Sequence, residues 1–372
     1  MGLSAMRRLT VVQLLPALES GGVERSTLEI AEALLRAGHR AIVVSAGGRM
    51  VPALERTGAE HITLDIGSKS PLALRHVSTL LRLFARERVD IVHARSRLPA
   101  WIGWLALRGM GVSRPRFVTT VHGLNSPSRY SAIMTRGDRV LCVSDTVRDY
   151  VLRHYPLTDA AKLRVIPRGI DPEAFPRIPR PDREARAWAS GLHPQLGGEG
   201  PLLLLPGRGT RLKGHATALS LLRRLRADGS DARLWLPGAR EAGRARYLAE
   251  LEAASADLAG AVAFTAPVEE VARAYAASNL VLQLSRKPEA FGRTVLEALS
   301  VGRPVVGWDH GGVGELLHAL QPEGAVAPFD EDALQATVRA LLAHPPAPPV
   351  TIPHTLHAMQ EATLAVYAEL CG

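Results

Sequence analysis

The sequence predicts an α/β protein made of two doubly wound halves. Short apolar runs alternate with amphipathic segments, the alternation stops at residues 171–200, and it then starts again. The length of 372 residues also suits two domains of ordinary size. Strands separated by helices predict parallel sheets of βαβ units, whose ligands bind at the carboxyl ends of the strands. Two such halves facing each other would form a central cleft.

The composition is that of a folded globular protein, with 47% hydrophobic and 22% charged residues, which excludes disorder, collagen and coiled coil. Two cysteines, Cys142 and Cys371, cannot form a disulfide framework and suit a reducing compartment. The start, Met1–Val12, lacks a small-residue cleavage site and leads into a predicted strand, so we do not interpret it as a signal peptide. The longest apolar stretch, Leu98–Val112, is too short to span a bilayer. We therefore expect a cytoplasmic protein.

The first half contains apolar runs that predict buried strands and periodic segments that predict helices. The expected strands are Leu9–Leu15, Arg40–Ala46, His61–Leu64, Val89–His93, Phe117–His122 and Arg139–Ser144, and the expected helices are Glu24–Ala37 and Pro71–Arg88.

Prolines and glycines between residues 171 and 200 predict a linker that contains a short helix, Arg183–Ala189. Beyond it the same alternation predicts the second half. Its expected strands are Pro201–Pro206, Ala232–Leu236, Val262–Thr265, Leu280–Leu284 and Pro304–Trp308, and its expected helices are Ala216–Asp228, Thr294–Val301 and a final helix, His354–Leu370. We expect domains at 1–172 and 173–353, with the helix in 354–372 returning to the first domain.

The positive charge is concentrated in the first half. Residues 1–172 hold 25 Lys and Arg against 14 Asp and Glu, a net of +11, whereas the remainder holds 20 against 22, a net of −2. Such asymmetry favours an acidic partner: nucleic acid, anionic lipid headgroups or a phosphorylated substrate. A solvated surface in an arginine-rich protein is the alternative.

Two glycine-bearing loops each follow a predicted strand and precede a predicted helix. Gly21 and Gly22 allow close backbone approach to a ligand at a helix N-terminus, although an ordinary βα turn has the same pattern. In the second loop, Gly207–Gly214, the cations Arg208 and Lys213 suit a diphosphate. Neither loop is a dinucleotide fingerprint or a P-loop.

The segment from Lys287 to Leu299 combines two glutamates with a helix start. Glu289 follows a predicted strand, and its carboxylate could bind sugar hydroxyls. Glu297 lies about one turn into a predicted helix, whose first amides could hold a phosphate. The segment could therefore bind a sugar, a diphosphate and a ribose.

These motifs in this order resemble the retaining glycosyltransferases of family 4, which have the GT-B fold of two Rossmann-like domains. The resemblance rests on the two glycine loops, the two glutamates and four further segments. Those segments are Val121-His122-Gly123, Val165–Asp171, Gly302-Arg-Pro-Val-Val and Gly311-Gly-Val-Gly-Glu315. The chain departs from the family at Arg168, where Asn is commoner, and at Gly314, where Pro is commoner. The stretches Thr120–Ser126 and Met134–Asp138 are most similar to bacterial enzymes of lipopolysaccharide core synthesis.

The resemblance implies transfer of a sugar, with retention of anomeric configuration, from a nucleoside diphosphate sugar to a glycan or phosphorylated glycolipid. It implies no other cofactor, and a UDP-sugar is the favoured donor. The implied catalytic residues are His122, Glu289, Arg208 and Lys213. The implied donor-binding residues are Gly21, Gly22, Arg208, Lys213, Glu289, Phe291, Gly292, Arg293, Thr294 and Glu297.

No metal site is expected. The pair Asp330 and Asp332 stands where a helix to His344 should begin, so we interpret it as a helix cap. Two other functions remain open: a GT-B epimerase that uses the same donor, and a non-enzymatic nucleic-acid-binding protein. The sequence lacks the aromatic platforms and motifs of nucleic-acid recognition, so no nucleic-acid partner is expected.

The segment Arg95–Arg116 contains Trp101 and Trp104 among basic and apolar residues. Tryptophans favour membrane interfaces and cations attract anionic headgroups, so this segment predicts peripheral association with anionic membranes. The alternative is a wholly buried helix.

Overall fold

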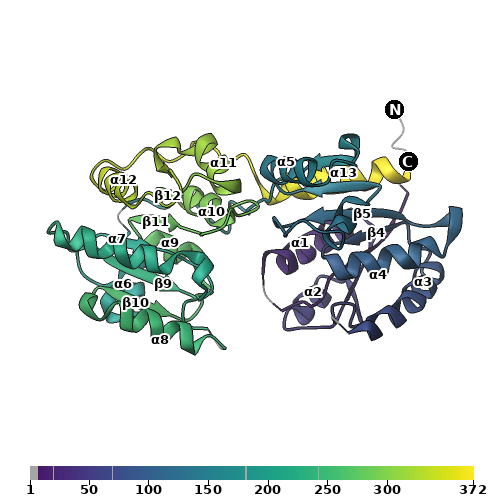
Figure 1. Cartoon of the computed structure of the whole chain (residues 1–372), viewed down its shortest axis with the longest axis horizontal. Helices are drawn as coiled ribbons and strands as arrows, with labels where there is room; N and C mark the ends of the chain where they lie inside the picture. Colours follow the sequence, from purple (N-terminus) through teal and green to yellow (C-terminus); the bar gives the residue numbers. More distant parts are fainter. Residues whose placement is uncertain (1–6, 20, 69, 181, 242) are drawn as a thin grey trace. The chain divides into compact units, whose positions relative to one another are not determined.

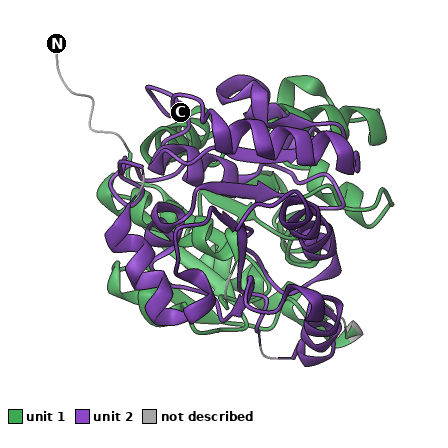
Figure 2. Cartoon of the chain, turned by 90° about the vertical axis from the view of Figure 1, so that its left-hand side faces the viewer, with its two compact units in different colours: residues 1–168, 356–372 green, residues 169–355 purple. Residues whose placement is uncertain are grey.

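The computed structural model describes residues 7–19, 21–68, 70–180, 182–241 and 243–372. The chain divides into two compact units, which Figure 2 shows in different colours. Unit 1 comprises residues 1–168 and 356–372, and unit 2 comprises residues 169–355. The first six residues of the start, which we do not interpret as a signal peptide, lie outside the described residues.

Unit 1 is built on a seven-stranded parallel sheet with the order β3-β2-β1-β4-β5-β6-β7. The central strands β1 and β4 are buried almost throughout, as expected for strands with helices on both faces. The strands are β1 (Thr10–Leu14), β2 (Arg40–Ser45), β3 (Glu60–Thr63), β4 (Ile91–Ala94), β5 (Arg116–Val121), β6 (Arg139–Cys142) and β7 (Leu163–Val165).

The helices of unit 1 flank this sheet (Figure 1). Among them α3 packs on α4, and the C-terminal helix α13 packs on α1. The α-helices are α1 (Gly22–Arg36), α2 (Val51–Arg56), α3 (His76–Arg86), α4 (Arg97–Arg108), α5 (Asp145–His154) and α13 (Leu356–Cys371); the short 3₁₀ helices are η1 (Pro71–Arg75), η2 (Gly111–Ser113), η3 (Ser131–Thr135) and η4 (Ala160–Lys162).

Unit 2 repeats this architecture with a six-stranded parallel sheet of order β10-β9-β8-β11-β12-β13. Its strands are β8 (Leu202–Leu204), β9 (Arg233–Pro237), β10 (Val262–Thr265), β11 (Leu280–Gln283), β12 (Val305–Trp308) and β13 (Ala325–Val326). Its α-helices are α6 (Arg183–Leu192), α7 (His215–Ala227), α8 (Ala245–Ala254), α9 (Val271–Ala277), α10 (Arg293–Val301), α11 (Gly311–Leu320) and α12 (Glu331–Ala343); its 3₁₀ helices are η5 (Pro194–Leu196), η6 (Arg211–Lys213), η7 (Ala256–Leu258) and η8 (Pro322–Gly324). The predicted fold class, two doubly wound α/β domains, is confirmed.

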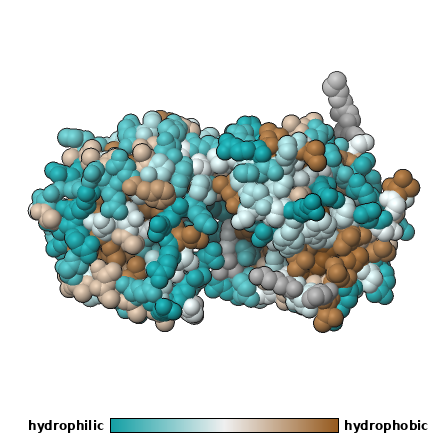
Figure 3. Space-filling model, viewed as in Figure 1, coloured by the Kyte–Doolittle hydropathy of each residue, from teal (hydrophilic) through white to brown (hydrophobic). Residues whose placement is uncertain are grey.

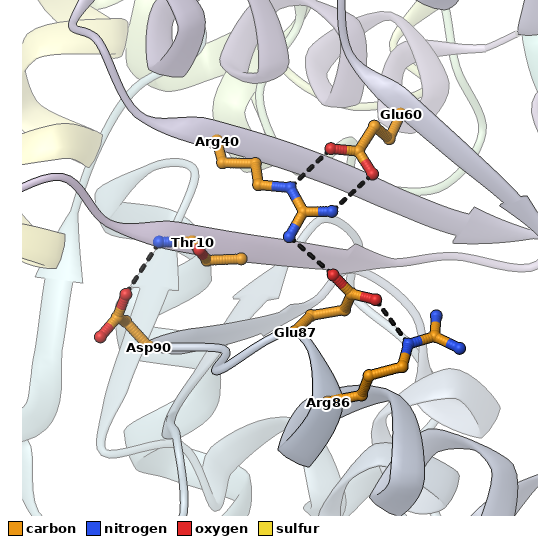
Figure 4. A network of polar contacts seen from close by, with 6 residues as sticks. All are labelled: Thr10, Arg40, Glu60, Arg86, Glu87 and Asp90. Carbon is orange, nitrogen blue, oxygen red and sulfur yellow. Dashed lines mark hydrogen bonds and ion pairs between the residues drawn. The ribbon is translucent and has the colours of Figure 1, made fainter.

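Polar contacts tie together the amino-terminal edge of the unit 1 sheet (Figure 4). Arg40, at the start of β2, forms two hydrogen bonds of 2.6 and 2.7 Å with Glu60 and one of 2.7 Å with Glu87. Asp90 accepts a 2.8 Å hydrogen bond from the amide of Thr10, the first residue of β1. Ligand chemistry is expected at the opposite edge, where the strands end.

The segment between residues 171 and 200 is more ordered than the predicted linker. It belongs to unit 2, and its helix α6 runs three residues beyond the predicted end at Ala189 and packs on α9. Ala185 and Ala189 are buried, and small side chains of this kind let two helices approach closely. The prolines that suggested a linker flank α6 instead of interrupting it.

Candidate functional site

Most of the residues expected to bind the donor lie in unit 2, on the loops at the carboxyl edge of its sheet and in the helix α10 that follows one of them. The loop 207–214 follows β8, and the segment 285–292 follows β11, the neighbouring strand. Because β8 and β11 are parallel neighbours, their loops emerge at the same edge. Lys213 and Glu289, 76 residues apart in sequence, are brought into contact there.

Gly214 determines how closely these two loops approach. Its backbone is left-handed, with φ of 80°, and a Cβ at this position would lie 2.1 Å from the carbonyl oxygen of Leu284. Only glycine meets both demands without displacing the chain. The glycine therefore seats the loop against the end of β11 and places the neighbouring Lys213 beside Ser285 and Glu289.

The Glu289 carboxylate has three polar partners. Lys213 Nζ lies 2.6 Å and Ser285 Oγ 2.5 Å from Oε1, and Gln283 Nε2 lies 3.4 Å from Oε2. Burial alone would raise the pKa of Glu289, but the Lys213 charge and these hydrogen bonds outweigh it and hold that pKa below its usual value. The carboxylate is therefore ionised at neutral pH and held in one orientation.

The start of α11 supports the main chain at Glu289. The Gly312 amide donates a 2.8 Å hydrogen bond to the Glu289 carbonyl oxygen. Gly311 has φ of 60°, and a Cβ there would lie 2.5 Å from the same oxygen. His310 Nε2 lies 3.0 Å from the carbonyl oxygen of Ser285. The segment 310–312 thus fixes the loop that carries Glu289, the partner of Lys213.

Helix α10 begins directly after this loop. Its cap, Gly292, is left-handed with φ of 102°, and Arg293 and Thr294 form its first turn, where backbone amides have no partner within the helix. Phe291 is buried and packs edge-on against His354, with ring centroids 5.9 Å apart. The predicted donor-binding residues 291–294 therefore form one continuous loop and helix start, buried at Phe291 and Gly292 and partly exposed at Arg293 and Thr294. Such a helix start favours anions.

Glu297 lies one turn into α10 and is 7% exposed. Tyr275 donates a 2.9 Å hydrogen bond to Oε2, and Arg293 lies 3.4 Å from Oε1. The sequence had no signal for Tyr275, which reaches Glu297 from α9. A ribose that hydrogen-bonds to Glu297 would therefore meet a carboxylate already oriented by Tyr275 and Arg293.

Arg208 differs from Lys213 in its surroundings. Its side chain is exposed and has no hydrogen bond or ion pair among the residues that the structure describes. Lys213 is half-buried and paired. The exposed Arg208 can therefore bind an incoming anion directly. Lys213 can do so only if it gives up its ion pair with Glu289 or binds both groups at once.

The unit 1 candidates lie at the carboxyl edge of their own sheet. Gly21, with φ of 149°, caps α1, and Gly22 is the first residue of that helix. His122 directly follows β5 and hydrogen-bonds through Nδ1 to the guanidinium of Arg168.

Sequence reasoning missed several residues that hold these candidates in place. Gln283, Ser285 and His310 surround Glu289, and Tyr275 contacts Glu297. Their only sequence signal is their position at strand ends or on a neighbouring helix, a position that many structural residues share.

The predicted helix cap is confirmed, because Asp330 accepts a 2.9 Å hydrogen bond from the amide of Ala333 at the start of α12. Asp332 pairs with Arg224. Within the described ranges, His, Cys, Asp and Glu form no cluster of three or more that could hold a metal ion.

Two family models match consecutive parts of the chain. Residues 20–174 match Glycosyltransferase Family 4, and residues 193–356 match Glycosyl transferases group 1. With the two parallel-sheet units described above, these matches define the class: the chain belongs to the glycosyltransferases of the GT-B fold.

Among curated proteins, the chain is similar in sequence to a D-inositol 3-phosphate glycosyltransferase of Jonesia denitrificans. It is 30% identical over 251 residues, which cover 60% of this chain and 56% of the relative. The chain thus spans little more than half the length of the curated relatives that it matches.

Solved structures share the fold along nearly the whole chain. A glycosyltransferase from Rickettsia africae ESF-5 has a TM-score of 0.84 and 26% identity, covering 98% of both chains. Anabaena Alr3699/HepE, solved in complex with UDP and glucose, has a TM-score of 0.79 and 18% identity, covering 96% of this chain and 99% of its own. WaaG, a glycosyltransferase involved in lipopolysaccharide biosynthesis, has a TM-score of 0.66 and 19% identity, covering 97% of this chain and 94% of its own.

Proposed function

We propose that this protein transfers a sugar from a nucleoside diphosphate sugar to a glycan or a phosphorylated glycolipid. The observation that carries the proposal is the contact of Lys213 with Glu289, in a loop that also carries the exposed cation Arg208, near the start of α10. A sugar needs a directed acceptor such as Glu289, and a diphosphate needs cations and helix amides. UDP is the favoured nucleotide, and the UDP and glucose bound by Anabaena HepE support that choice.

The chemistry of such a transfer requires positive charge at the leaving group. Cleavage of the bond between sugar and diphosphate builds negative charge on the diphosphate, and preorganised donors stabilise it. In the proposal Arg208, Lys213 and the first amides of α10 supply this stabilisation, so no metal ion is assigned to the step. In unit 1, the proposal keeps His122 as the implied catalytic residue.

Retention of configuration is part of the proposal. A double displacement needs a carboxylate that is free to attack the anomeric carbon. Glu289 is instead held by Lys213 and Ser285, an arrangement suited to binding sugar hydroxyls. We therefore assign front-face attack by the acceptor, with the leaving phosphate as the base.

The acceptor is assigned to unit 1, whose sequence carries the excess positive charge. A phosphorylated acceptor fits that charge. Support comes from the name of the Jonesia relative, which specifies a phosphorylated inositol, and from the lipopolysaccharide role of WaaG. The short motifs near His122 favour lipopolysaccharide core or another surface polysaccharide as the product.

A surface around α4 suits the membrane that would carry such an acceptor. Arg97, Trp101, Trp104, Arg108, Tyr130 and Arg136 form this tryptophan–arginine surface. Trp101 and Trp104 are half-buried and meet edge to face at 5.6 Å, and the Arg136 guanidinium lies 5.0 Å from the Trp104 ring. Figure 3 shows hydrophobic side chains gathered over α3 and α4.

The α4 helix is therefore neither wholly buried nor able to cross a membrane. It spans Arg97–Arg108 and buries Ile102 and Ala106, while Arg108 stays exposed. Arg95 is only 3% exposed and bonds to Gln13, so it is not one of the surface cations. In the part of the chain that the structure describes, no helix is long and apolar enough to be a membrane span. Peripheral contact at the inner face of the cytoplasmic membrane is thus the proposed mode.

Vesicle co-sedimentation tests the membrane part of the proposal. Binding should rise with the fraction of anionic lipid and fall with salt, because each cation near the surface contributes about 1 kcal/mol and is screened within about 8 Å at physiological ionic strength. The double variant Arg108→Glu/Arg136→Glu should bind at least about tenfold more weakly.

The variant Arg246→Glu is the matched control, because it changes the charge of an exposed arginine on α8 in unit 2. Equal, salt-independent recovery of the wild type with neutral and anionic vesicles would contradict membrane association. The glycosyltransferase proposal would survive that result.

A panel of nucleotide sugars tests the function itself. The correct donor should raise the melting temperature by mass action, and turnover of that donor should depend on an added acceptor. Acceptor-independent conversion of the donor would instead indicate an epimerase. Salt-steep binding to DNA without any donor effect would indicate a nucleic-acid-binding protein.

A further inference from the structure

His122 and Arg168 form a hydrogen bond whose direction follows from the chemistry of arginine. One guanidinium nitrogen of Arg168 hydrogen-bonds Nδ1 of His122, and another hydrogen-bonds Oγ of Ser26 on α1. The second nitrogen also lies 3.9 Å from the sulfur of Met359 on α13. Strand end, helix and C-terminal helix therefore hold the guanidinium from three sides.

An arginine side chain can only donate hydrogen bonds and keeps its charge at any physiological pH. Nδ1 of His122 must therefore accept, and it carries no proton. The neutral ring then holds its single proton on Nε2. The arginine thus selects one of the two tautomers of the ring.

The surroundings of His122 disfavour its protonated form. Burial comes first, and the positive charges of Arg168 and Arg95 together with His93 add to it, so the pKa of His122 lies well below its usual value. Arg95 and His93 both come from the end of β4, the neighbouring strand. His93 itself is occupied on both ring nitrogens, by Tyr367 and Thr120 at 2.6 Å each.

The protonated nitrogen has no partner within the described residues. Nε2 of His122 is buried and accepts or donates no hydrogen bond there. A buried N–H without an acceptor destabilises the site, because it has lost its water without gaining a partner. His122 directly follows strand β5, at the edge of the sheet where ligands of such folds bind. A ligand oxygen would remove that destabilisation.

We propose that Arg168 is a positioning residue that holds His122 as a neutral Nε2–H donor for an oxygen of the bound sugar or phosphate. Because Nδ1 is occupied by Arg168 and Nε2 already bears the proton, His122 is not a general base. Its part in the reaction is a directed hydrogen bond. The identity of the ligand rests on the proposed function, but the state of the ring does not.

Nitrogen NMR on protein labelled with ¹⁵N-histidine reads the ring directly, and the variant His122→Gln identifies its signals. In the wild type His122 should show a protonated Nε2 and an unprotonated Nδ1 throughout pH 5.5–8. In Arg168→Met the ring loses the donor at Nδ1, so its proton should be shared between Nδ1 and Nε2, while burial, the first cause of the low pKa, remains. Arg168→Gln, which offers a neutral donor, should keep more of the Nε2–H tautomer than Arg168→Met.

A wild-type ring protonated on Nδ1, or one that titrates in the usual range, would overturn the proposal. So would an Arg168→Met variant that folds with an unchanged melting temperature and leaves the signals of His122 unaltered. These readouts need no donor or acceptor, so they stand even if the proposed function fails.

Turnover separates a hydrogen-bond donor from a base. The amide of His122→Gln can place an N–H near the position of Nε2 but cannot take up a proton. Its kcat should stay within about tenfold of the wild type, whereas His122→Ala should lose about 10²-fold, the effect of removing one preorganised hydrogen-bond donor. Equal losses in the two variants would contradict the donor role, and the pH profile of the wild-type kcat should show no histidine titration.

Discussion

Replacing Arg208 or Lys213 with alanine should lower the rate of sugar transfer by about 10²–10³-fold, the effect of removing one preorganised charge stabiliser. Arg208 is exposed, so its loss should leave the melting temperature unchanged. Lys213 pairs with Glu289, so its removal also leaves a partly buried carboxylate without its cation. We expect Lys213→Ala to lose some thermal stability in addition to activity. Steady-state kinetics and thermal unfolding of both variants measure the two effects.

Arg211 provides the matched control for these variants. It lies on the same loop and has the same charge, but it pairs with Glu250 and covers the ring of Tyr247. Arg211→Ala should therefore keep near-normal turnover. If Arg208→Ala and Lys213→Ala both turn over normally, the diphosphate assignment is wrong. If Arg211→Ala loses as much as they do, only the overall charge of the loop matters.

Substitution of the two glutamates should separate sugar recognition from nucleotide binding. Glu289→Gln should reduce turnover by about 10²-fold or more, because a directed charged acceptor is lost, while the free nucleoside diphosphate still binds. The nucleoside diphosphate should even bind more tightly to this variant, because Lys213 is no longer paired with a carboxylate. Glu297→Gln should weaken the nucleoside diphosphate itself through its ribose.

Calorimetry with UDP measures this difference, and an identical loss of affinity in both variants would refute the division of roles. Tyr275→Phe is the control for Glu297→Gln, because it removes the 2.9 Å hydrogen bond to the carboxylate but leaves the carboxylate in place. A UDP affinity equal to that of Glu297→Gln would show that orientation of the side chain, rather than its charge, decides binding.

The fold was predictable because each half repeats a local pattern. The buried strand Leu202–Leu204 is a continuous apolar run, and Leu280–Gln283 is apolar up to its last residue. Helices such as α1 carry apolar residues at helical spacing. The predictions left out the strands β7 and β13 and the helices α2, α5, α8, α9 and α11. The two strands, of three and two residues, and the helices α2 and α9, of six and seven, have too few residues for a periodic signal. The helix expected over 71–88 begins instead as the 3₁₀ turn η1 and becomes α3 only at His76.

The candidate site was predictable as a set of motifs, but its contacts were not. Arg208, Lys213, Glu289 and Glu297 stand out because cations, glycines and carboxylates recur at strand ends. The pairing of Lys213 with Glu289 depends on the order of β8 and β11 in the sheet and on the close approach at Gly214. No spacing within the sequence contains either fact.

The sequence by itself determined the two doubly wound halves, the excess of positive charge in the first and the candidate residues for binding a diphosphate sugar. Each is a property of local order or composition. Only the tertiary structure decided that Arg95 is buried while Arg136 lies over Trp104, and that Arg168 contacts His122 from 46 residues away. These contacts join segments distant in the chain, and their energies depend on burial and on neighbouring charges. Such quantities exist only once the strands have taken their places in the sheet.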